Sequence, residues 1–141
     1  MAKALEVYYR PDHGQEPLIV RTPDEVRRLF ADWLRDFPTG SVALATVHLV
    51  EDPWGAELSV GVDGDKGVLR YSGDEPGGNG HYSRDPESGN TDPAIYYFFT
   101  ADHEYPPHSE IPVTAVESAV LEFMSTGRRP TCVEWQDPRH S

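Results

Sequence analysis

Residues 22–40 read TPDEVRRLFADWLRDFPTG, and this stretch predicts one well-defined amphipathic helix. Thr22 is placed to cap the helix, Pro23 to occupy its first position and Glu25 to complete a capping box. The closing PTG is a stop signal. The apolar residues recur at helical spacing and form one stripe, made of Val26, Leu29, Phe30, Trp33, Leu34 and Phe37. Such a helix requires an apolar surface to pack against.

A second amphipathic helix is predicted over residues 113–126. Thr114 and Glu117 have the spacing of a capping box, which leaves open a start one residue later. Gly127 is placed to end the helix with a positive φ. The buried stripe of this helix is expected to be Val113, Val116, Ala119, Val120, Phe123 and Met124.

The rest of the chain is rich in β-forming segments separated by turns. The Gly- and Asp-rich residues 63–67 predict a tight hairpin, and short turns of this kind join antiparallel strands. Residues 72–93 are too long for an inert connection in a compact domain, and residues 101–112 are expected to be loop. Strands are expected at 4–10, 18–20, 41–50, 57–62, 68–71, 81–83, 94–100 and 131–135.

Two amphipathic helices of this length need one sheet to cover. The predicted fold is therefore α+β, a single domain over residues 1–141, with an antiparallel sheet of about six strands and both helices mainly on one face. A chain of 141 residues can bury a core without disulfides. Cys132 is the only cysteine, which excludes an intrachain disulfide and fits a reducing cytoplasm. The absence of a long apolar run or a signal-peptide pattern also favours a cytoplasmic location.

The charge is strongly negative and unevenly distributed. The chain has 24 Asp and Glu against 12 Lys and Arg, a formal net charge of −12. Residues 41–110 alone hold 13 of the acidic residues and only 3 of the basic ones. Such a field repels nucleic acid and anionic membranes, so neither is expected as a partner, and it attracts basic proteins. The alternative is that the charge serves solubility alone.

Known catalytic and cofactor motifs are missing from the sequence. There is no C-x-x-C as a zinc deaminase needs, and no G-x-S-x-G elbow. Asp63-x-Asp65 lacks the glycine of a calcium loop, and the glycine-rich residues 77–80 do not lead into a helix that would hold phosphate. His103, Glu104 and His108 are more typical of a polar loop than of a metal site. No catalytic residue, metal or cofactor is expected.

The C-terminal third carries a resemblance to a known family. Residues 105–136 contain YPPHSEIPV, a helix, and then STGRRPTCVEWQ. This pattern resembles the first-numbered immunity protein family of bacterial polymorphic toxin systems, and the middle of the chain matches it loosely. The resemblance implies an α+β fold and a non-enzymatic protein that binds and neutralises a toxin, often one of the cytidine-deaminase superfamily. The matching residues are Ala119, Val120, Glu122, Phe123, Thr126, Gly127, Arg129, Pro130, Val133 and Trp135.

The family signature is interpreted as a signature of the fold. Gly127 lets the chain leave the helix, and Pro130 fixes the approach to the last strand. Trp135 is expected to pack in the core against Phe123, with its indole N–H bonded to a carbonyl. Arg129 belongs to the same structural motif.

The residues that contact the toxin are then expected on the acidic middle of the chain. A toxin that modifies nucleic acid needs a cationic groove, and an acidic surface can occupy this groove in place of the substrate. Aromatic side chains are expected to anchor the contact. The candidate residues are Asp74, Glu75, Asp85, Glu87, Asp92, Asp102 and Glu104, with Tyr82 and Tyr105 as anchors.

Two other classes of function stay open at this point. One is a non-catalytic scaffold or subunit with a permanent partner, for which a large apolar patch would be diagnostic. The other is an enzyme with an unfamiliar site around His81, His103 and His108.

Overall fold

The computed structural model describes residues 3–8, 16–36, 43–73, 80–87, 91–98 and 101–136. The predicted helix stop at 37–40 lies outside these ranges. The elements in chain order are β1 (Leu5–Tyr8), β2 (Leu18–Val20), α1 (Pro23–Asp36), β3 (Ala43–Leu49), β4 (Asp52–Asp63), β5 (Lys66–Ser72), β6 (His81–Arg84), β7 (Ala94–Phe98), β8 (Ala101–Tyr105), β9 (Ile111–Pro112), α2 (Val113–Thr126) and β10 (Glu134–Gln136).

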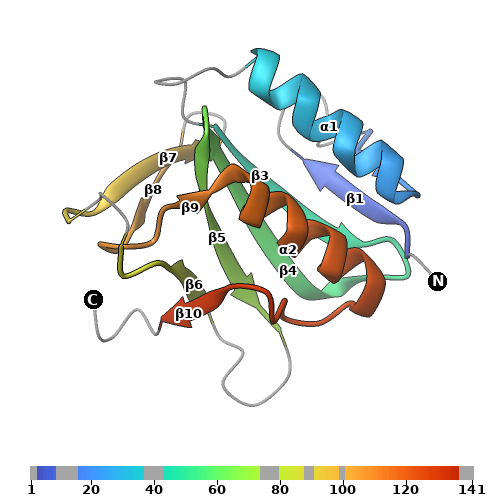
Figure 1. Cartoon of the computed structure of the whole chain (residues 1–141). Helices are drawn as coiled ribbons and strands as arrows, with labels where there is room; N and C mark the ends of the chain where they lie inside the picture. The colour runs from blue at the N-terminus through green and yellow to red at the C-terminus, as the bar shows by residue number, and fades with distance from the viewer. Residues whose placement is uncertain are drawn as a thin grey trace.

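The main sheet is antiparallel, and the predicted α+β class is confirmed. Within the described residues it has eight strands in the order β10-β6-β5-β4-β3-β1-β2, with β9 paired to β5 (Figure 1). This is more than the six that the sequence predicts. The hairpin predicted over 63–67 joins β4 to β5. Asp63 pairs with Lys66 across a two-residue turn in which Gly64 has φ 65°.

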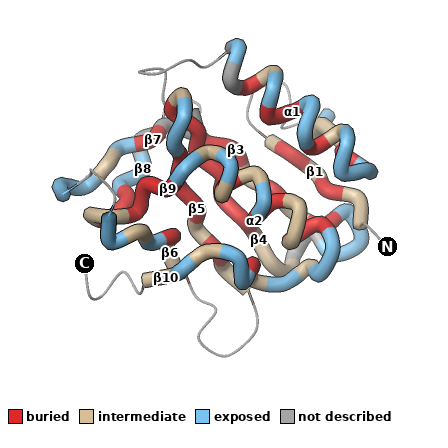
Figure 2. The backbone as a smooth tube through the Cα atoms, viewed as in Figure 1, coloured by how far each residue is buried: buried red, intermediate tan, exposed pale blue. Residues whose placement is uncertain are grey.

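Both helices cover one face of this sheet, as predicted (Figure 1). The strands supply every second residue to the core beneath them, and Figure 2 shows these strands as largely buried. The helix stripes fill the other half of the core. Its largest members include Phe30 and Trp33 from α1, Phe123 and Met124 from α2, and Val47, Leu58, Leu69 and Tyr71 from the strands.

The two helices begin in different ways. At α1 the Thr22 hydroxyl accepts a hydrogen bond from the Glu25 amide at 3.2 Å, and the Glu25 carboxylate accepts one from the Arg21 amide at 2.9 Å. The predicted cap is therefore present. In a standard capping box the Glu25 carboxylate would accept from the amide of Thr22, whereas here it accepts from the amide of Arg21. Helix α2 begins at Val113 after Pro112, with no side-chain cap.

The end of α2 follows the prediction closely. Gly127 has φ 70° and ψ 15°, and its amide donates a 2.8 Å hydrogen bond to the Phe123 carbonyl. A residue with a side chain would be strained in this left-handed conformation. A Cβ at this position would also lie 2.9 Å from a methyl group of Leu49. The glycine therefore serves both the turn and the packing of α2 against β3.

The prediction of loop over 101–112 is wrong in two places. Ala101–Tyr105 forms β8, which pairs with β7 in a separate two-stranded sheet, and Ile111–Pro112 forms β9. The sequence ADHEY has little β propensity, so this strand depends on its pairing with β7 and on packing. The hairpin packs on the face of the main sheet that the helices leave free. The contact is a second apolar cluster of Leu44, Val68, Tyr96 and Tyr105, with partly buried Tyr82 and Ala94.

The C-terminal motif ends in Trp135, whose side chain packs against the core on the helix side of the main sheet. Trp135 donates its indole N–H to the Pro130 carbonyl at 2.8 Å, as predicted. Its ring neighbour, however, is Tyr71 at 6.3 Å between centroids, and Tyr71 lies 6.4 Å from Phe123. Tyr71 therefore stands between the two residues that the sequence places in contact.

The last strand starts later than predicted, at Glu134. The Glu122 carboxylate accepts hydrogen bonds from the Thr131 amide at 2.7 Å, the Thr131 hydroxyl at 2.9 Å and the Cys132 amide at 3.1 Å. These bonds bind residues 131–132 to α2, so their amides are directed to the helix and the strand can only begin beyond them.

Candidate functional site

The face of the main sheet opposite the helices carries a row of polar side chains beside the second apolar cluster. We call it the helix-free face, and it is built by the strand residues that alternate with the core residues. Thr46 pairs with Ser59, Ser59 with Arg70, and Arg70 with Tyr82. Because direct cross-strand partners share a face, these four residues form one polar row across β3, β4, β5 and β6.

A pocket lies between this row and the β7–β8 hairpin. Its volume is about 450 Å³, which is within the range of small-ligand pockets. The main sheet supplies one wall and β8 supplies the other. The lining residues are Leu44, Thr46, Glu57, Ser59, Arg70, Tyr82, His103, Glu104 and Tyr105.

Arg70 is held at the β5–β6 side of the pocket. Its guanidinium carbon lies 5.8 Å from the centroid of the Tyr82 ring, a cation–π distance. The backbone at Gly80 also lies close to this guanidinium. A Cβ there would lie 2.8 Å from Nη2 of Arg70, and Gly80 has φ 70°. The absence of a side chain at Gly80 therefore makes room for the guanidinium.

Tyr105 forms the buried part of the pocket wall. Its residue is only 1% exposed, and its ring packs 5.2 Å from Tyr82 and 5.7 Å from Tyr96. Burial and the neighbouring Tyr82 raise the pKa of the Tyr105 hydroxyl, so the group stays neutral. Little of Tyr105, one of the two expected aromatic anchors, is therefore accessible to a partner. Tyr82 is half-buried and offers more of its ring to a partner.

The described acidic candidates lie at one end of the molecule, around β6, β7 and β8 (Figure 1, left). Glu87, Asp92 and Glu104 are exposed and Asp85 is half-buried. The Asp85 carboxylate accepts a 3.0 Å hydrogen bond from the Glu87 amide, which orders the turn after β6. We call these four residues the acidic end. Asp74 and Glu75 lie outside the described residues, and for Asp102 only the backbone position on β8 is described.

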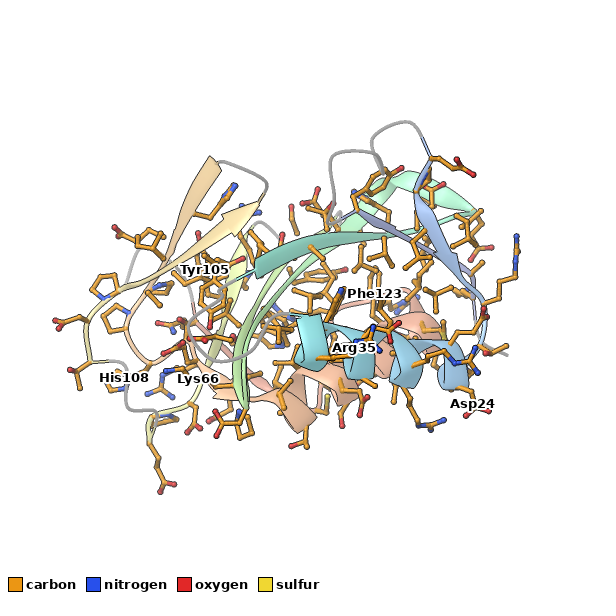
Figure 3. The ribbon with its side chains drawn as sticks, turned by 90° about the horizontal axis from the view of Figure 1, so that it is seen from above. Asp24, Arg35, Lys66, Tyr105, His108 and Phe123 are labelled. Carbon is orange, nitrogen blue, oxygen red and sulfur yellow. The ribbon has the colours of Figure 1, made fainter. Side chains whose placement is uncertain are left out.

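The basic side chains of α1 lie away from the acidic end. Figure 3 shows Asp24 and Arg35 on α1 at one side of the molecule, and Tyr105 and His108 at the other. Arg27 and Arg28 belong to the same helix and are exposed. Helix α1 carries both signs, since Asp24 and Asp32 pair with Arg27 and Arg35. Residues 85–104 contain acidic residues and no Lys or Arg, and they follow the exposed Arg84 at the end of β6.

Residues 14–137 match the protein-family model described as Immunity protein Imm1. The chain belongs to the Imm1 family of immunity proteins. A comparison with curated proteins finds none that matches. Membership in this family implies an immunity protein directed against a toxin. Neither helix in the described ranges is long and apolar enough to cross a membrane.

The signature residues of this immunity protein are placed to support the fold. Phe123 is fully buried, Pro130 is buried, and Gly127 ends α2. Arg129 is half-buried beside Pro130, and Trp135 packs against Tyr71. All five lie on α2, β10 or the segment between them. None lines the pocket.

The sequence interpretation missed part of the pocket. It named Tyr82, Glu104 and Tyr105, which the structure brings together, but not Glu57 or Arg70. A signal for these two was present. Polar residues at 57, 59, 70 and 72 alternate with core residues, which is typical of strands that bury one face only. What the alternation could not show is that the hairpin closes over this face.

Proposed function

We propose that this immunity protein binds a cognate toxin domain, a cytidine deaminase acting on nucleic acid, and covers its substrate site with the acidic end. The observation that carries this proposal is the uneven charge. Residues 41–110 hold 13 acidic and 3 basic residues. Asp85, Glu87, Asp92 and Glu104 lie at one end of the molecule, and the arginines of α1 lie elsewhere.

The physical basis is electrostatic complementarity. An enzyme that acts on nucleic acid holds phosphates with Arg and Lys, and carboxylates can pair with the same side chains. Complementary fields also accelerate encounter, towards about 10⁸ M⁻¹s⁻¹ at low salt. Fast capture suits a protein that must bind a toxin before it acts. Inhibition is then steric, since the bound immunity protein excludes the substrate.

Two observations favour this proposal over the alternatives. A permanent scaffold partner would need a large apolar patch, whereas the exposed large hydrophobics among the described residues are Val50, in the turn between β3 and β4, and Ile95 on β7. An enzyme around three histidines would need them to converge. The pocket includes His103 but neither His81 nor His108.

The proposal is tested with a candidate toxin domain, which is to be sought among the genes that neighbour this one. Purified toxin is incubated with single-stranded DNA or RNA, and cytosine deamination is measured against increasing immunity protein. Stoichiometric inhibition is expected, with loss of the toxin's binding to the oligonucleotide. Neutralisation of a toxin with no deaminase activity would overturn the deaminase assignment. Inhibition with the oligonucleotide still bound would overturn the substrate-site assignment.

A further inference from the structure

The β7–β8 hairpin has an inner and an outer face. Tyr96 and Tyr105 lie on the inner face, where they pack on the main sheet and are each 1% exposed. Ile95 and Glu104 alternate with these tyrosines along the two strands, and they are direct cross-strand partners. Both Ile95 and Glu104 are exposed. The outer face of the hairpin therefore presents an apolar side chain beside a carboxylate.

The surroundings of Ile95 distinguish it from the other exposed apolar side chain. Among the described residues, Val50 and Ile95 are the exposed large hydrophobics, with 37% and 38% of their surface accessible. Val50 precedes Glu51, which pairs with Lys3 at 2.8 Å, so both signs of charge are present there. Ile95 lies within residues 85–104, which contain acidic residues and no Lys or Arg. Ile95 is therefore an apolar group within an acidic surface.

We infer that Ile95 is the apolar anchor of the toxin contact, and that Glu104 beside it pairs with a basic side chain of the toxin. The inference rests on the proposed function and adds an uncharged residue to the contact. Apolar side chains enclosed by polar groups are the usual centres of binding energy in interfaces. A basic toxin is favoured over a second copy of this chain, because two copies would bring their acidic ends together.

The hairpin holds Ile95 in position before any partner binds. The hydroxyl of Tyr96, the next residue, donates a hydrogen bond to the buried Glu110 carboxylate. The Tyr96 ring packs 5.7 Å from that of Tyr105, centroid to centroid. A side chain on a fixed backbone loses little freedom when it is covered, so more of the free energy of its burial contributes to affinity.

An apolar anchor and an acidic surface act on different rate constants. Complementary charge accelerates the encounter of two proteins, whereas contacts that are desolvated in the complex slow its dissociation. Loss of Ile95 is therefore expected to change the dissociation rate constant. Loss of the acidic end is expected to change the association rate constant.

The first test compares Ile95→Thr with Val50→Thr, since both variants keep a β-branched side chain and the net charge. Ile95→Thr is expected to accelerate dissociation of the toxin about tenfold, because apolar burial is lost. Its association rate constant should stay within about twofold, and Val50→Thr should change neither constant by more than that. Urea unfolding curves check that both variants fold. Dissociation from Ile95→Thr that is no faster than from Val50→Thr would overturn the inference.

The second test follows the contact without any substitution. Protein with labelled Ile and Val methyl groups is mixed with a neutral gadolinium chelate, which broadens the NMR signals of accessible methyl groups. In the free protein the signals of Ile95 and Val50 should both broaden. Unlabelled toxin should protect Ile95 and leave Val50 accessible. The inference is wrong if Ile95 stays accessible in the complex, or if the protein alone protects Ile95 at high concentration by pairing with a second copy.

The outcomes separate the two proposals. If the wild-type protein inhibits deamination while Ile95 stays accessible in the complex, the inference fails and the proposed function stands. If Ile95 is protected by a bound toxin that has no deaminase activity, the deaminase assignment fails and the anchor stands. If the wild-type protein forms no complex with the toxin, both fail.

Discussion

The hydroxyl of Tyr96 donates a 2.8 Å hydrogen bond to the carboxylate of Glu110, and both residues are buried. The other carboxylate oxygen lies 3.5 Å from Nζ of Lys66. Tyr96 belongs to β7, Glu110 precedes β9, and Lys66 begins β5. These contacts fasten the hairpin to the main sheet. Since β8 supplies one wall of the pocket, they also hold the pocket in shape.

Replacing Tyr96 with phenylalanine is expected to lower the free energy of unfolding by about 2 kcal/mol. The variant keeps the ring but leaves the buried Glu110 carboxylate without its neutral donor. The measurement is urea denaturation at pH 7. Tyr8→Phe is the matched control, because the Tyr8 hydroxyl bonds to Glu6 at a more accessible site. A loss no larger than that of the control would show that the bond does not secure the hairpin.

Alkaline pH is expected to destabilise the protein through its buried tyrosines. Burial raises the pKa of both Tyr96 and Tyr105 above the ordinary value of 10.0. In the unfolded chain these hydroxyls ionise near pH 10, so their contribution to stability is complete below that pH and is lost as the pH rises above it. Urea titrations from pH 8 to 11 measure the slope. Tyrosinate absorbance should show that Tyr96 and Tyr105 resist ionisation until unfolding; ionisation of all seven tyrosines in the folded protein would contradict this.

Glu122 is expected to make stability depend on acidic pH. Partial burial raises the pKa of Glu122, but the hydrogen bonds from Thr131 and Cys132 outweigh it and lower the pKa overall. Because the pKa of Glu122 is lower in the folded protein than in the unfolded chain, where it is near 4.5, the ionised carboxylate stabilises the fold above that pH. This stabilisation is lost as the pH falls through the pKa of the folded state. Glu122→Gln should therefore cost about 1 kcal/mol at pH 7 and less at pH 3. Glu117→Gln on the same helix is the control. An equal cost at both pH values would exclude a role for the charge.

Two substitutions of Trp135 distinguish the contribution of its ring packing to stability from that of its hydrogen bond. Trp135→Ala removes the ring contact with Tyr71 and should cost about 3 kcal/mol, at the low end for a large core side chain because Trp135 is only partly buried. Trp135→Phe keeps a ring and loses the bond to the Pro130 carbonyl, and should cost about 1 kcal/mol. Thermal and urea unfolding give both values. A folded Trp135→Ala variant that cannot bind the toxin would place the interface at β10 instead.

Local signals in the sequence were enough to predict both helices. The cap at Thr22 and the glycine at Gly127 act through bonds to residues within a few positions, so their effect does not depend on the rest of the fold. The strand at 81–83 was predicted for similar reasons, from short β-forming residues between turns, and lies within β6.

Features that depend on distant contacts were not predicted. Strand β8 exists because residues 101–105 pair with β7, which no pattern in ADHEY indicates. The contact of Trp135 with Tyr71, and the late start of β10, likewise depend on how α2 and β5 meet. The pocket combines four strands of the main sheet with β8, and its volume follows from the placement of the hairpin over the helix-free face.

The role of the acidic end in toxin capture is decided by the association rate constant with the toxin, measured by stopped flow at several salt concentrations. One variant, called the acidic-end variant, carries Asp85→Lys, Glu87→Lys and Asp92→Lys. The control carries Asp24→Lys, Asp32→Lys and Glu51→Lys and has the same net charge, with its changes on α1 and the β3–β4 turn. The acidic-end variant is expected to associate about tenfold or more slowly at low salt than the control, with a flatter salt dependence and nearly unchanged stability. Equal rates for the two variants, or full toxin protection by the acidic-end variant, would contradict it.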